Sequence, residues 1–280
     1  MTFTPLLTTA HAAGSSSSTA FFHQLIRDQF TIQTWLAFGA VAQCLLFLLP
    51  IRAIYAVAPA FILLLAKAVD TAMITFNLKP NTYAAGILDT KFTALIPNPD
   101  GTFGKKENQS SPDKVTVLLL GFRINHPLGP LAPGAQEIVN FFQNMAKDLQ
   151  AHAPDNGYLG STTYLNASSD RATKSEIMTT FYFRSLKDSD TFAHSPVHRE
   201  GWIWWSKVRK QYKHLSISHE VYEAPKGKFE NIYENCEPTG FAATSYQITD
   251  EKDEKKWISP VVEAMKGQLA NGSGRWKAYD

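Results

Sequence analysis

The sequence predicts an α+β protein whose strands and helices follow the order β-α-β-β-α-β, behind an N-terminal part that attaches to a membrane. Two observations lead to this prediction. Only five of the 52 charged side chains occur in the first 78 residues. From residue 114 onward, stretches with the period of a strand alternate with stretches with the period of a helix. The 27 basic and 25 acidic residues include no run of five like charges, so no nucleic-acid-binding surface is indicated.

Residues 1–29 are expected to form a disordered tail, because the serine run at 15–18 is surrounded by residues with neither charge nor hydrophobic period. This tail does not resemble a secretory signal, in which basic residues precede an apolar core. The uncharged stretch 30–49 would make about 30 Å of helix, which matches the thickness of a bilayer core.

A second apolar segment begins at residue 53, and it could span the membrane, re-enter it or lie flat on it. Within this segment Lys67 and Asp70 could pair three residues apart on a helix. We therefore expect one or two membrane helices within 30–78, in the endoplasmic reticulum or another endomembrane. Lys and Arg are too sparse to fix their orientation. The alternative is a buried helical hairpin of a soluble protein.

Prolines and glycines mark residues 79–113 as a linker, with one short element at most, at 84–95. Residues 114–245 form the expected catalytic domain. Residues 246–280 form a C-terminal extension, in which 257–269 could be a helix. The asparagines of three Asn-X-Ser sequons could carry glycans only on a lumenal side: Asn108, Asn166 and Asn271.

The expected catalytic domain contains four strands and two helices. The apolar, β-branched stretch 114–124 predicts a strand that is buried on both faces. Apolar residues recur at three and four over 136–151, which predicts an amphipathic helix. Ser195 followed by Pro196 is a typical helix start and predicts a second helix from there. The remaining strands are expected at 157–165, 176–184 and 215–222, with a shorter candidate at 229–233.

This element order gives a ferredoxin-like, four-stranded antiparallel sheet with both helices on one face. The other face would need a cover, and two copies that close these faces together would form a dimeric α/β barrel with an internal pocket. If the apolar residues of each strand pack on the helices, four other side chains line the open face: Tyr182, Arg184, Glu220 and Tyr222. They could equally belong to a wet dimer interface.

His194 and His198 have the i, i+4 spacing of a metal-binding pair, but a cap at Ser195 would leave His194 outside the helix. His219 is the only nearby candidate for a third ligand, so we predict no metal site and expect packing or proton transfer instead. The two cysteines lie too far apart for a CxxC-based zinc site. Trp202 and Trp205 share one helix face, which predicts helix–sheet packing or a pocket wall. A Gly-rich nucleotide-binding loop is missing from the sequence.

Two segments of the chain resemble a known family. They are HSPVHREGWIWW at 194–205 and HLSISHEVYEAPKGKFENIYENCEPTGF at 214–241. Over residues 80–245 the chain is similar to fungal monooxygenases from secondary-metabolite gene clusters, of the fumagillin-pathway type. The most distinctive parts are HEVYE at 219–223 and FENIY at 229–233, where Phe229 replaces a commoner Tyr.

The resemblance implies a dimeric α/β barrel related to the antibiotic-biosynthesis monooxygenases, often behind membrane segments, that acts on polyketide- or terpenoid-derived intermediates. In that superfamily oxygenation often proceeds without metal or flavin, with molecular oxygen as co-substrate. Such chemistry needs a base, a group that stabilises an anion and a dry pocket. His219 or His198 would be the base and Tyr222 or Arg184 the stabilising group. The expected substrate contacts are Tyr182, Glu220, Trp202 and Trp205.

The sequence thus predicts a membrane-attached homodimeric oxygenase that modifies a lipophilic intermediate. Two alternatives stay open. One is a haem-dependent enzyme on the same scaffold, because the superfamily also contains haem enzymes such as aldoxime dehydratases. The other is a non-catalytic accessory protein that binds the intermediate.

Overall fold

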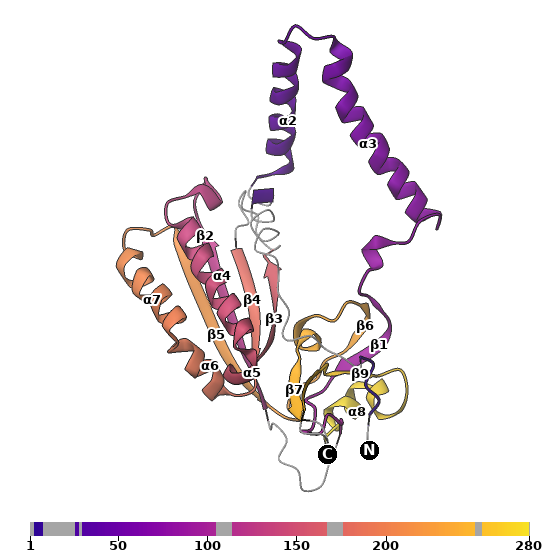
Figure 1. The fold of residues 1–280 in the computed structure, drawn as a ribbon, viewed down its shortest axis with the longest axis vertical. Helices are drawn as coiled ribbons and strands as arrows, with labels where there is room; N and C mark the ends of the chain where they lie inside the picture. Colours follow the sequence, from indigo (N-terminus) through magenta and orange to yellow (C-terminus); the bar gives the residue numbers. More distant parts are fainter. Residues whose placement is uncertain are drawn as a thin grey trace. The chain divides into compact units, whose positions relative to one another are not determined.

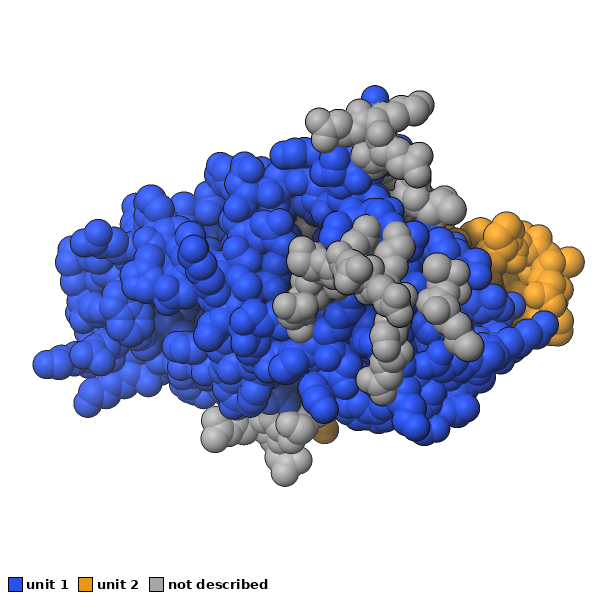
Figure 2. Space-filling model, turned by 90° about the horizontal axis from the view of Figure 1, so that it is seen from below, with its two compact units in different colours: residues 1–29, 87–280 blue, residues 30–86 orange. Residues whose placement is uncertain are grey.

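The structure is a computed structural model. It describes residues 3–7, 26–27, 30–104, 114–166, 176–249 and 254–279. Most of the expected tail and the sequon at Asn108 lie outside the described residues. The chain forms two compact units, residues 30–86 and residues 1–29 with 87–280, which Figure 2 shows in two colours.

The smaller unit is a helical hairpin, α2 (Ile32–Phe47) and α3 (Ala53–Thr75), followed by a 3₁₀ turn at Thr82–Ala84. Ala56 is the only residue of the two helices that is buried. Helix α3, with 23 residues, is long and apolar enough to cross a membrane. Helix α2 has 16 residues, about 24 Å, and is shorter than a bilayer core. The stronger spanning candidate is therefore the second segment and not residues 30–49.

The expected pairing of Lys67 with Asp70 is replaced by another ion pair. Asp70 accepts a hydrogen bond from Lys79, which follows the end of α3. Lys79 reaches Asp70 because the chain turns back after the helix, where the N–H groups of Leu78 and Lys79 both bond the carbonyl oxygen of Met73.

The larger unit contains a four-stranded antiparallel sheet with helices on one face (Figure 1). Its strands are β2 (Lys114–Ile124), β3 (Tyr158–Leu165), β4 (Glu176–Phe183) and β5 (Leu215–Pro225), in the order β3-β4-β2-β5. The helices are α4 (Ala135–Ala151), α6 (Leu186–Ala193) and α7 (Pro196–Val208), with a short α5 (Ala153–Asn156) and a 3₁₀ turn at Gly129–Leu131. The α+β class and the order β-α-β-β-α-β are confirmed, but α6, which precedes the helix expected from Ser195, was not predicted.

Ser195 caps α7 as expected, because its side-chain oxygen accepts a hydrogen bond from the backbone N–H of His198 at 3.3 Å.

Alternate residues of the strands build the core beneath the helices. Apolar side chains of β2, β4 and β5 pack on α4 and α6 in two adjoining clusters. Their buried members include Leu118, Phe122, Ile124, Ile138, Val139, Leu149, Ile177, Phe181, Phe183, Phe192 and Leu215.

Two small sheets complete the larger unit. Strand β1 (Leu88–Ala94) lies between β6 (Tyr233–Cys236) and β9 (Val261–Glu263), and β7 (Tyr246–Thr249) pairs with β8 (Lys255–Ile258). The prediction of a helix at 257–269 is wrong. Pro260 and the β-branched pair that follows it favour strands, so β8 and β9 occupy this stretch, before a 3₁₀ turn at Gly267–Ala270 and α8 (Gly272–Trp276).

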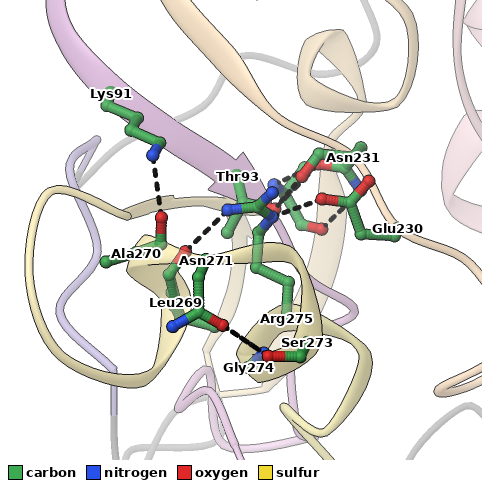
Figure 3. Close-up of polar contacts among 11 residues, drawn as sticks. Lys91, Thr93, Glu230, Asn231, Leu269, Ala270, Asn271, Ser273, Gly274 and Arg275 are labelled. Carbon is green, nitrogen blue, oxygen red and sulfur yellow. Dashed lines mark hydrogen bonds and ion pairs between the residues drawn. The ribbon is translucent and has the colours of Figure 1, made fainter.

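A polar cluster around Asn231 and Arg275 joins segments that the sequence assigned to a linker and a C-terminal extension (Figure 3). The Asn231 side chain accepts from the N–H of Ala94 at 2.7 Å and donates to its carbonyl oxygen at 3.0 Å. Arg275 forms an ion pair with Glu230. Because the Asn231 side chain takes up the backbone groups of Ala94, the strand expected at 229–233 begins only at Tyr233.

The stretch 79–113 is therefore more than a linker, and 246–280 more than an extension. Phe92 and Ile96 from the first and Val261 from the second are fully buried in one cluster. A 3₁₀ turn at Gly240–Ala243, η3, belongs to the same cluster through Phe241 and covers part of the sheet face opposite the helices.

Candidate functional site

A cavity of about 120 Å³ lies on the helix side of the sheet, between β2, β5, α4 and α7. Its walls are aliphatic and aromatic, apart from two imidazole rings. The lining residues are Leu120, Gly121, Phe122, Ile138, Phe141, Phe142, Met145, His198, Gly201, Trp202, Trp204, Trp205, Ile217 and His219. Trp202, Ile217 and His219 are also exposed to solvent, so the cavity opens beside them.

The alternation of β5 places His219 in the cavity. Ile217 and His219 share the face that looks toward the helices, and His219 lies opposite Leu120 of β2 in the strand register. Glu220, the next residue, points to the other side of the sheet. The period of α7 similarly places His198, Trp202 and Trp205 on one helix face.

His198 is the more enclosed of the two histidines. Its Nδ1 atom is buried and has no hydrogen-bond partner within the described part of the chain. Burial lowers the pKa of His198, and positive charge on His219 or His194 would lower it further, against an opposing effect of the Ala193 backbone. Burial therefore favours the neutral form of this imidazole. Its ring contacts Phe192 edge to face, with centroids 5.4 Å apart.

Gly201 and Met145 help to shape the cavity, and the sequence prediction missed both. A Cβ atom on Gly201 would lie 2.6 Å from the terminal methyl carbon of Met145. The absence of a side chain at this position lets α7 approach α4 closely beside the cavity. The only sequence signal was a glycine within an otherwise uninterrupted helix, which often has a packing reason.

Four of the residues expected to line a pocket do not line this cavity. Tyr222 donates a hydrogen bond to Glu220 at 2.5 Å, and both side chains are exposed on the opposite face of the sheet. Tyr182, on the same face, packs against Phe241 with ring centroids 5.7 Å apart. Arg184 follows the end of β4, where its N–H bonds the carbonyl oxygen of Gly157 at 2.9 Å.

The sheet therefore divides the expected set in two. His198, His219, Trp202 and Trp205 line the cavity on the helix side. Tyr182, Glu220 and Tyr222 lie on the other side because residues next to each other in a strand point to opposite faces. Burial, and then the neighbouring Tyr233 and Tyr164, raise the pKa of Tyr182. The hydrogen bond to Glu220 raises the pKa of Tyr222.

The described ranges contain no cluster of side chains that could bind a metal ion. Nowhere in them do three or more His, Cys, Asp or Glu side chains converge in a way that could hold an ion. His194, which the sequence pairs with His198, is exposed, and its ring lies against Asp190, with Nδ1 2.8 Å from the backbone oxygen.

Comparison with known proteins identifies the family. The model of the family described as "Monooxygenase af470-like" matches residues 115–241. Monooxygenase af470 of Aspergillus fumigatus is 30% identical over 252 residues, which cover 89% of this chain and 87% of the relative. The expectation of a monooxygenase family is confirmed, whereas the fumagillin-pathway type stays a prediction.

Solved structures match more weakly. An aldoxime dehydratase crystallised with butyraldoxime has 16% identity and a TM-score of 0.39 over 54% of this chain and 42% of its own, so the chain spans less than half of that protein. SnoaB of Streptomyces nogalater, a cofactor-independent oxygenase, has 13% identity and a TM-score of 0.27 over 39% of this chain and 91% of its own. These similarities are too low to carry an argument. The sequence relative is decisive: the chain belongs to the monooxygenase af470-like family.

Proposed function

We propose that this protein is a monooxygenase that oxidises a lipophilic, polyketide- or terpenoid-derived intermediate with molecular oxygen and without metal or flavin. Family membership supports an oxidoreductase activity. The observation that carries the finer proposal is the cavity itself, because its walls are mostly apolar while two imidazoles from different elements face into it.

In this proposal His219 is the base. It removes a proton from an acidic CH₂ group of the substrate, and the resulting carbanion donates an electron to O₂. The radical pair combines to an alkylperoxide anion, which takes a proton from the His219 imidazolium and becomes a hydroperoxide. Loss of water, which includes the second hydrogen of the same carbon, leaves a carbonyl group. One oxygen atom of O₂ thus enters the product and the other leaves as water, so no external reductant is required.

His198 is the group that stabilises the substrate anion in this proposal. Its neutral ring can donate one hydrogen bond toward developing negative charge without carrying a charge of its own. Tyr222 and Arg184, the stabilising groups expected from the sequence, do not line the cavity, so His198 takes that role.

The size of the cavity limits what enters it. A cavity of roughly 150 Å³ holds one benzene molecule, so about 120 Å³ admits a single ring or the end of a chain. We infer that only the reacting part of the substrate is enclosed. The remainder would extend past Trp202, whose side chain is 58% exposed.

Haem does not fit this site as it stands. The unpartnered Nδ1 of His198 offers a ligand atom. However, ligation would require the centre of a four-pyrrole macrocycle next to an imidazole, inside a space the size of one ring. The haem-dependent alternative would need α4 and α7 to move apart, and a Soret absorption band in the purified protein would reveal it.

Attachment to an endomembrane and the formation of a homodimer complete the proposal. The apolar helix α3 supports attachment, and a substrate that partitions into lipid would explain its use. The dimer rests on the exposed part of the sheet face opposite the helices, around Glu220 and Tyr222. Sedimentation of the full chain in detergent at twice its mass, corrected for the detergent, is the expected result.

The activity is tested by oxygen uptake of the full chain in detergent. The probes are lipophilic compounds with an acidic CH₂ group, such as anthrone and β-diketone derivatives with alkyl chains, and ¹⁸O₂ reports oxygen transfer. His219→Ala should lower the turnover by roughly 100-fold or more. The matched control is Ser218→Ala, one residue away on the other face of β5.

The two outcomes are distinct. Unchanged turnover in His219→Ala would remove this histidine from the mechanism. Tight binding of the probes without ¹⁸O incorporation into any of them would favour the non-catalytic accessory protein instead.

A further inference from the structure

We infer that α2 and α3 enter the bilayer together as one hairpin, tip first, so that both ends of the hairpin lie on the same side of the membrane and the tip stays within the lipid. This inference rests on the membrane attachment proposed above but not on the oxygenase chemistry. Both helices and the turn between them belong to the same compact unit, so their arrangement is part of the structure.

From Ile32 to Ala66 the hairpin carries no charged side chain apart from Arg52 at the turn. Helix α2 buries none of its residues and α3 only Ala56, so their aliphatic and aromatic side chains face outward. The turn is apolar as well, and Leu48 at its start is 81% exposed. A pair of helices without a polar face is suited to hydrocarbon and not to water.

The lengths of the two arms favour a tip that remains in the bilayer. Helix α2 is about 24 Å long, and the uncharged part of α3, from Ala53 to Ala66, is about 21 Å. Both are shorter than a hydrocarbon core of about 30 Å. Arg52, at the tip, can extend its long side chain across the remaining distance to the opposite headgroups.

A cross-helix hydrogen bond joins the arms near the tip. The side-chain amide of Gln43 in α2 donates to the backbone oxygen of Ala56 in α3 at 2.9 Å. In hydrocarbon an amide group needs such a partner, because no water is available to it. The two arms are therefore tied together at the depth where polar groups are most costly.

The opposite end of the hairpin has the features of a membrane–water boundary. Phe30, Trp35 and Phe38 pack edge to face at the start of α2, with ring centroids 5.5 to 6.0 Å apart. Asp70 and Lys79 form an exposed ion pair at the end of α3. Aromatic rings and paired charges collect at this boundary, which marks the base of the hairpin.

The test uses the full chain with Cys44 and Cys236 replaced by alanine and one new cysteine at a time. Ile32→Cys and Leu78→Cys probe the two ends and Leu48→Cys the tip, at positions whose side chains are 78%, 73% and 81% exposed. Sealed microsomes are treated with a membrane-impermeant maleimide, before and after the vesicles are opened with a pore-forming toxin. Detergent gives the total reactivity of each cysteine.

We expect the cysteines at 32 and 78 to react from the same side and the cysteine at 48 to react only in detergent. Reaction at 32 and 78 from opposite sides would show that α3 crosses alone, and the inference would be wrong. Reaction at 48 from the far side, or in intact vesicles together with the ends, would equally overturn a tip buried in lipid. Release of the parent chain by sodium carbonate would disprove membrane attachment itself, and none of these results depends on activity.

Discussion

The two faces of the four-stranded sheet consist of alternate residues of the same strands, yet their surroundings differ. On the helix side, buried apolar residues surround a small cavity that contains His219. On the other side, Tyr182 lies beneath Phe241 of the chain's own η3 turn, while Glu220 and Tyr222 face solvent. The difference shows that the cavity lined by His219 lies beneath the helices and not on the face that the helices leave open.

The largest expected effect concerns the core of the helix side. Phe181 is 1% exposed and packs between Phe142 and Tyr158. Phe181→Ala should lower the free energy of unfolding by about 3 to 5 kcal/mol, because a large cavity replaces the ring. Tyr182→Ala, one residue away on the half-buried face, should cost less. Thermal unfolding followed by near-UV circular dichroism measures both, and equal losses would contradict the distinction between the faces.

A smaller loss in the free energy of unfolding is expected at the polar cluster around Asn231, which holds the end of β1 in place. Asn231→Ala removes both partners of the Ala94 backbone groups, which should cost about 1 to 3 kcal/mol. Glu234→Gln, on the exposed edge of β6, is the matched control and should change stability by less than about 0.5 kcal/mol. If the two variants unfold at the same temperature, the polar cluster is not needed to hold β1.

Gly201→Ala tests the size of the cavity. The added methyl group would push the end of the Met145 side chain toward the lining, whereas the better helix propensity of alanine offsets part of the strain. We expect KM for the bulkier probes to rise by about 10-fold, with little change in melting temperature. Adding Met145→Ala to the same chain should restore KM. Loss of turnover for all probes regardless of size would contradict a role in size selection.

The smallest expected effect is on how the folding stability depends on pH. Burial lowers the pKa of His198 in the folded protein, so the unfolded chain, with a histidine pKa near 6.5, binds the proton more readily. The stability due to this difference is present above about pH 6.5 and decreases as the pH falls toward the lowered pKa. Melting temperatures between pH 8 and pH 5 should therefore fall less in His198→Phe than in the parent chain. Parallel curves would show that His198 is not buried as described.

Much of the sheet and its helices can be predicted from hydrophobic period and capping chemistry, because these signals are local. Residues 114–124 form β2 with the expected bounds, and Ser195 with Pro196 starts α7. Strand β1 lies within the short element expected at 84–95, but its place in a sheet was not predicted because its partners, β6 and β9, are far away in the sequence. Pairing at such distance leaves no local pattern.

Local sequence patterns were also insufficient to predict the candidate site. Strand alternation shows that His219 and Glu220 have different surroundings, but it does not show which face of the sheet is hollow. That depends on how closely Gly201 lets α7 approach α4. Of the distinctive stretches, only His219 of HEVYE lines the cavity, whereas Glu230 and Asn231 of FENIY hold neighbouring segments together. A sequence signature can thus mark architecture as well as chemistry.

The position of β1 between β6 and β9 has a consequence for biosynthesis. The ribosome makes the hairpin and β1 early, but β9 emerges only after the whole four-stranded sheet has been synthesised. The nascent chain can therefore insert into lipid while β1 still lacks both neighbours. Contacts so distant in sequence form slowly, and an unpaired strand invites aggregation. Tethering to a bilayer during this interval would keep nascent copies apart until each can close on itself.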